Sequence, residues 1–133
     1  MAPVTRKAMA KYAYFNLNPK GLRTSDCVIR AFSYFLGMGW REAFIDLFTW
    51  CADRGIVTFN YRSTYYQYLK EKGYPKHKAP RKGITVAQFA DEYAKEKMVY
   101  ILQGKRHLTI ISDKCIFDIG DCSEMIVDAY WER

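Results

Sequence analysis

The sequence has no long apolar run and few of the residues that build metal sites. No apolar stretch approaches the roughly 20 residues that a membrane-spanning helix needs, and the basic segment 1–11 is not followed by the apolar region of a signal peptide. Its four cysteines form no Cys-x-x-Cys pair, and only two histidines accompany them. These absences predict a cytoplasmic protein with reduced thiols, no membrane segment, no metal and no organic cofactor.

The composition is that of one folded domain with a basic surface. Hydrophobic residues make up 50% of the 133 residues and charged residues 26%, so we expect a single domain over 1–133, with 1–11 as a basic and flexible arm. The net charge of +7 favours an acidic protein or nucleic acid as a partner, and the loop Lys76–Lys82 with His77 is the candidate contact surface. Because the basic residues are spread along the chain, solvated faces explain most of them.

Four segments carry apolar residues at helical spacing. The first helix has Thr24, Ser25 or Asp26 as a possible cap and Gly37 as its stop. The others are predicted over Trp40–Ala52, with Phe44 among the inward positions, from Ser63 to about Lys72, and over Val86–Ala94. Between the last two, Tyr74–Gly83 is expected to be an irregular loop because of its prolines.

The second half of the chain has the short β-branched or aromatic runs of strands. They are separated by turn residues and are expected to form an antiparallel meander: Met98–Leu102, His107–Ile111, Cys115–Ile119 and Met125–Trp131. Near the other end, Tyr12–Leu17 is either a short strand or an extended arm. The predicted fold class is α+β, with N-terminal helices packed against a C-terminal antiparallel sheet.

Cys27 stands in the first turn of the first predicted helix. The unpaired N–H groups and the dipole of a helix N-terminus lower the pKa of a thiol, and the same N–H groups can hold an oxyanion. The position alone is also that of a small buried apolar residue. Cys51 and Cys115 lie inside apolar patterns, and Cys122 lies in a polar turn with no evident base nearby.

His107 and Asp118 are predicted to be neighbours on two strands of one hairpin. A turn at Asp113–Lys114 makes them diagonal neighbours on one face, and a turn at Ser112–Asp113 places them directly opposite each other. A three-residue loop would send them to opposite faces. An aspartate in an apolar strand needs a partner, although a solvated strand end is the other explanation for Asp118.

The order Cys27, His107, Asp118 resembles the papain-like cysteine peptidase superfamily, in which a cysteine at a helix start meets a histidine and an aspartate or asparagine on successive strands. The motifs are Asp26-Cys27-Val28-Ile29-Arg30-Ala31, His107-Leu108-Thr109-Ile110-Ile111 and Phe117-Asp118. They look most like the small single-domain members of bacteria and phages, and the resemblance covers about Asn18 to Trp131. It implies a papain-like fold and a catalytic triad of Cys27, His107 and Asp118.

The resemblance also implies an oxyanion donor six residues before the cysteine, where the family commonly has glutamine and this chain has Gly21. Asn18 or Thr24 is a candidate substitute, with Asn18 preferred because its amide lies in the turn just upstream, and ordinary turn chemistry before Pro19 explains Asn18 at least as well. We therefore expect a cysteine hydrolase of peptide or isopeptide bonds that acts on a peptide or protein, with amidase, deamidase or acyl-transfer chemistry open to the same triad. The alternative is an inactive papain-like module that binds an acidic partner or nucleic acid.

Overall fold

The computed structural model describes residues 10–133, which form four helical segments and a six-stranded sheet. The arm expected over 1–11 therefore lies outside the described residues, except that Lys11 already begins a strand. In chain order the elements are β1 Lys11–Tyr14, α1 Cys27–Leu36, α2 Trp40–Arg54, α3 Arg62–Glu71, β2 His77–Lys78, α4 Val86–Gln88 continued by the π-helical turn Phe89–Tyr93, β3 Val99–Gly104, β4 His107–Ser112, β5 Cys115–Asp118 and β6 Ala129–Glu132. Among residues 10–133 no helix has the length and apolar character needed to cross a membrane.

The fold class α+β is confirmed, but the sheet is mixed instead of antiparallel. The strand order is β1-β5-β4-β3-β6-β2, and β1 runs parallel to β5 at one edge. The expected meander is also wrong for the last strand, because β6 pairs with β3 and does not continue beyond β5. The burial of β6 gives the reason: Tyr130 and Trp131 point to opposite faces and both are buried, which suits an inner strand with neighbours on each side.

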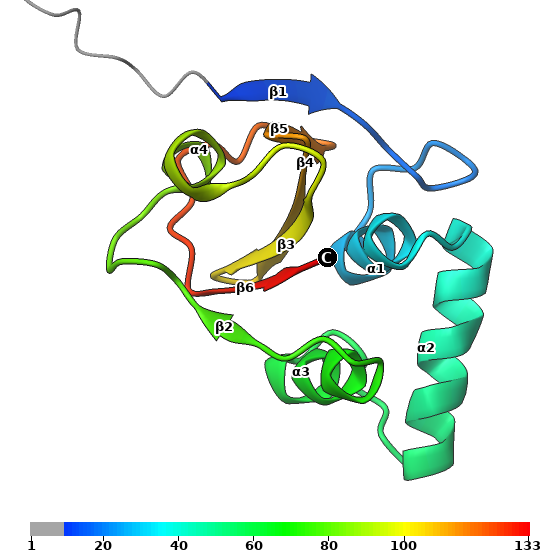
Figure 1. The fold of residues 1–133 in the computed structure, drawn as a ribbon. Helices are drawn as coiled ribbons and strands as arrows, with labels where there is room; N and C mark the ends of the chain where they lie inside the picture. Colours follow the sequence, from blue (N-terminus) through cyan, green and yellow to red (C-terminus); the bar gives the residue numbers. More distant parts are fainter. Residues whose placement is uncertain (1–9) are drawn as a thin grey trace, which may run out of the picture.

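Helices cover both faces of the sheet. α1, α2 and α3 lie on one face, with α1 between the sheet and α2 (Figure 1). α4 and the π-helical turn pack on the opposite face, where Phe89 is fully buried against Tyr100 and Tyr130. Residues of each inner strand therefore alternate between two apolar clusters, as the period of two in a strand requires. Phe44 of α2, expected to point inward, is instead 36% exposed.

The segment Tyr74–Gly83 is not wholly irregular. His77 and Lys78 form the two-residue strand β2, which pairs with β6 and completes the sheet at its other edge. An edge position explains why the flanking prolines are tolerated, since only one side of the strand needs its N–H groups. The ring of His77 stacks on Tyr130, with 5.0 Å between the ring centroids.

Two local features that position the site agree with the sequence. α1 ends at Gly37, which has the left-handed φ of 67° and donates its N–H to the carbonyl of Tyr34. The β4–β5 hairpin turns at Asp113–Lys114, where both residues have positive φ, as in a type I′ turn. Ser112 consequently pairs with Cys115, which is the first of the two predicted registers.

Candidate active site

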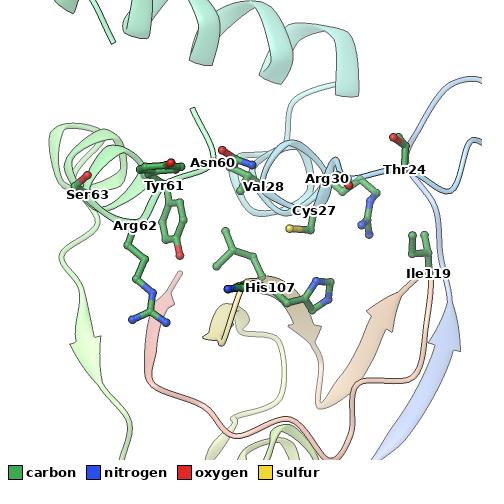
Figure 2. Close-up of a pocket in the computed structure, with 14 residues that line it drawn as sticks. Thr24, Cys27, Val28, Arg30, Asn60, Tyr61, Arg62, Ser63, His107 and Ile119 are labelled. Carbon is green, nitrogen blue, oxygen red and sulfur yellow. The ribbon is translucent and has the colours of Figure 1, made fainter. Parts of the chain in front are cut away.

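A cleft of about 820 Å³ lies where the N-terminus of α1, the segment that enters α3 and the β3–β4 turn meet (Figure 2). Cys27 and His107 both line it. Cys27 is the first residue of α1, and His107 is the first residue of β4. The fold thus brings together at one cleft two residues that are 80 positions apart in the sequence.

The N-terminus of α1 is capped in an unusual way. Asp26 occupies the capping position, yet its carboxylate accepts no hydrogen bond from the first turn of the helix. It accepts hydrogen bonds from Nε of Arg30 at 2.7 Å and from Nε1 of Trp40 at 2.9 Å instead. The first N–H groups of α1, beside Cys27, therefore keep their capacity to stabilise negative charge.

His107 links Asp118 to Cys27. Its Nε2 lies 2.6 Å from Oδ2 of Asp118, whose side chain is only 2% exposed. The side chain of His107 also lowers the pKa of the Cys27 thiol, and both residues line the same cleft. Because Nε2 is engaged by Asp118, Nδ1 is the nitrogen left for the thiol. The Thr109–Asp118 pairing that the register implies makes His107 and Asp118 the diagonal neighbours predicted from the sequence.

The pKa shifts at this site favour a thiolate–imidazolium pair. Burial raises the pKa of Cys27, but the hydrogen bonds from His107 and from the backbone of Leu108 outweigh burial and leave this pKa lowered. Burial lowers the pKa of His107, but hydrogen bonds, first of all to Asp118, raise it to about 11. Burial also opposes ionisation of Asp118, yet its bond to His107 holds the pKa of this carboxyl well below its usual range.

A buried arginine supports the aspartate from behind. Arg30 is 7% exposed and donates from one guanidinium to two carboxylates, to Asp26 at 2.7 Å and to Oδ1 of Asp118 at 3.0 Å. The backbone N–H of Ile119 donates to the same Oδ1 at 2.7 Å. Both oxygens of Asp118 are therefore hydrogen-bonded, Oδ2 to the imidazole of His107 and Oδ1 to Arg30 and the backbone of Ile119. Asp118 is a buried and paired residue, so the solvated strand end considered from the sequence is excluded.

The other cysteines differ from Cys27. Burial raises the pKa of both Cys51 and Cys115. Cys122 was expected to have no base nearby, but its Sγ lies 3.6 Å from Oδ2 of Asp118, because the segment after β5 folds back over the strand end. The donor atoms of His107, Asp118 and Cys122 lie within 4.8 Å of one another, so these residues have the ligand types and proximity to coordinate a metal ion.

Asn18 lies outside the cleft. It is 8% exposed, its Nδ2 donates to Asp26 at 3.2 Å, and its Oδ1 accepts the backbone N–H of Lys20 at 2.9 Å. These contacts hold the Asn18 side chain in the turn before α1 and against Asp26. The cleft contains instead residues that sequence analysis did not select, among them Asn60, Arg62 and Arg106. Asn60 and Arg62 come from the segment that enters α3, Arg106 comes from the β3–β4 turn, and no local sequence motif identifies them.

No family model, curated protein or solved structure matches the chain significantly. The α+β fold is thus established by the structure alone.

Proposed function

We propose that the protein is a papain-like cysteine hydrolase that cleaves peptide or isopeptide bonds. One observation carries the proposal: Cys27, at a helix N-terminus, and His107 line the same cleft, and Asp118 holds the His107 ring by a hydrogen bond. Nucleophile, base and orienting group thus stand in the order that acyl transfer requires. The free thiol of Cys27 suits a reducing compartment, which supports a cytoplasmic location.

The proposed reaction begins with attack of the Cys27 thiolate on the carbonyl carbon of the substrate. The carbonyl oxygen becomes an oxyanion beside the first N–H groups of α1. When the tetrahedral intermediate collapses, the C–N bond breaks, and the imidazolium of His107 gives its proton to the leaving amine. The acyl group is then a thioester on Cys27.

Water completes the cycle. Neutral His107 takes a proton from water as the oxygen attacks the thioester carbonyl, and the C–S bond breaks to return the thiolate. Asp118 keeps the ring of His107 oriented and stabilises its cationic form in both half-reactions. Amide, deamidation and acyl-transfer substrates would use the same steps with a different acceptor or leaving group.

Thiol alkylation tests the nucleophile. At pH 6 an ordinary thiol with a pKa near 8.5 is roughly 0.3% ionised, so we expect iodoacetamide to modify Cys27 at least about ten-fold faster than Cys122. Mass spectrometry locates each adduct. The variant His107→Ala should remove the advantage, whereas Cys115→Ser, a change of thiol remote from the cleft, should not alter it.

Turnover of a library of internally quenched peptides tests the activity itself. Cys27→Ser should abolish cleavage, and Cys115→Ser should retain it. Equal alkylation rates at Cys27 and Cys122, unchanged in His107→Ala, would refute the triad. Fast alkylation with no cleavage, together with salt-sensitive retention on nucleic acid in Cys27→Ser, would instead support the binding module.

A further inference from the structure

The cleft beside Cys27 is positively charged. Three arginines, Arg30, Arg62 and Arg106, are among the residues that line it, and none of the lining residues is an aspartate or glutamate. The charge of Arg30 is neutralised, because Asp26 and Asp118 both form ion pairs with it. The excess positive charge in the cleft therefore comes from Arg62 and Arg106.

Both of these arginines can bind a ligand. Arg62 has one ion pair, with Asp128 at 3.7 Å, and each side chain of this pair is about half exposed, so the pair contributes little and can open. Arg106 is exposed and has no ion pair within residues 10–133. Figure 2 shows the side chain of Arg62 extending from the start of α3 along the side of the cleft opposite Ile119.

The positions of the arginines are not explained by the stability of their own elements. Arg62 is the first residue of α3, where the helix dipole disfavours a cation, and no acidic residue offsets it in the first turn. Arg106 has a φ of 61° in the β3–β4 turn, a conformation that glycine or asparagine adopts at lower cost. Both side chains nonetheless line the cleft next to the thiol.

We propose that the cleft selects substrates that carry a carboxylate close to the bond to be cleaved, held by the guanidinium groups of Arg62 and Arg106. The carboxylate is either the side chain of glutamate or aspartate or the free C-terminus of a peptide. Arginine suits this role because its planar fork matches the two oxygens of a carboxylate. The substrate class rests on the proposed hydrolase function, whereas the charge selectivity of the cleft can be measured without turnover.

Alkylation by a matched pair of small probes measures this selectivity. Iodoacetate and iodoacetamide react alike: the Cys27 thiolate forms an S–C bond with the methylene carbon, and iodide leaves. They differ in one negative charge, so the ratio of their rates at Cys27 reports the local field. Arg62→Gln/Arg106→Asn removes both charges, and asparagine tolerates the left-handed turn. Lys82→Gln/Lys95→Gln is the control, with the same change in net charge on exposed positions outside the cleft.

We expect the iodoacetate to iodoacetamide ratio to fall about 3- to 10-fold in the arginine variant at low salt and to stay near the wild-type value in the lysine control. The wild-type ratio should also fall as ionic strength rises. Equal ratios in the wild type and the arginine variant, or an equal fall in both variants, would overturn the proposal. Either of these two results would still be consistent with the proposed triad, provided that Cys27 reacts faster than Cys122.

Peptide pairs then separate the two sources of the carboxylate. Peptides that differ by glutamate or glutamine at one position test the side chain, and peptides with a C-terminal acid or amide test the terminus. The proposal is supported if the wild type cleaves the acidic peptide of one pair faster and Arg62→Gln/Arg106→Asn does not. The pair that shows this preference identifies the carboxylate as a side chain or a C-terminus. Efficient cleavage with no acidic preference in either pair would overturn it while it confirms the hydrolase.

Discussion

Replacing Arg30 with methionine is expected to destabilise the fold severely, although methionine fills much of the same space. Arg30 is the cation between two carboxylates, and the exposed fractions of the three side chains are 8% for Arg30, 6% for Asp26 and 2% for Asp118. The substitution removes the cation that pairs with Asp26 and leaves Asp118 with His107 as its remaining counterion. Removing one partner of a buried ion pair typically costs about 3 to 5 kcal/mol, because the remaining charge stays desolvated.

Urea denaturation measures this loss. Since a domain has about 5 to 15 kcal/mol of stability in total, the variant should lose a large part of it. With a urea m-value of about 2 kcal/mol per molar, the unfolding midpoint should fall by roughly 2 M while the m-value is kept. Arg30→Lys keeps the charge but loses the planar guanidinium group, so its urea midpoint should lie between those of the wild type and Arg30→Met.

The pH dependence distinguishes a charge effect from a packing effect. In the wild type the pKa of Asp118 is lower in the folded state, so its ionised form adds stability above the unfolded pKa, about 3.9, and this stability is lost as pH falls. The difference in unfolding free energy between wild type and Arg30→Met should therefore be largest near neutral pH and shrink as the pH falls below about 4. A difference under about 1 kcal/mol, or one that does not vary with pH, would refute the assignment of Arg30 as a buried counterion.

Two further predictions concern pH and Asn18. As pH increases, kcat/KM should rise at a pH below the usual pKa range of thiols, because the pKa of Cys27 is lowered. It should fall again only as His107 loses its proton near pH 11. The raised pKa of His107 likewise adds stability that is complete below pH 6.5 and is lost as pH rises through about 11, which unfolding at alkaline pH can measure. Asn18→Ala should cost about 1 to 2 kcal/mol of stability in urea titration and leave the alkylation rate of Cys27 unchanged, since its amide is bonded to Asp26. A kcat reduced about 100-fold with stability intact would instead assign Asn18 to the oxyanion hole.

The parts of the site that the sequence predicted rest on local signals. The stop of α1 is encoded locally by Gly37, whereas Asp26, one of the predicted caps at its start, occupies the capping position without bonding the first turn. The register of the β4–β5 hairpin follows from its two-residue turn, and it places His107 and Asp118 together whatever the rest of the fold does. Signals of this range can be read from one sequence because they need no distant partner.

The parts that were missed depend on distant contacts. The parallel pairing of β1 with β5 joins residues about 100 positions apart, and the return of β6 to β3 skips two strands. Neither leaves a local pattern, because strand order is decided by burial in the finished sheet. The spacing of Asp26 and Arg30 was a visible i,i+4 signal, but the pairing of Arg30 with Asp118 was not.

The buried charges explain why the thiolate is favoured at Cys27. Asp26, Arg30, Asp118 and His107 form a series of contacts in which negative and positive groups alternate once His107 is protonated. A thiolate on Cys27 continues that alternation at the end that opens on the cleft. Moving the proton from Cys27 to His107 leaves the total charge unchanged, yet it places the imidazolium between two anions. Arg30 also lowers the pKa of Cys27 directly, so this one residue would support both ends of the proposed triad.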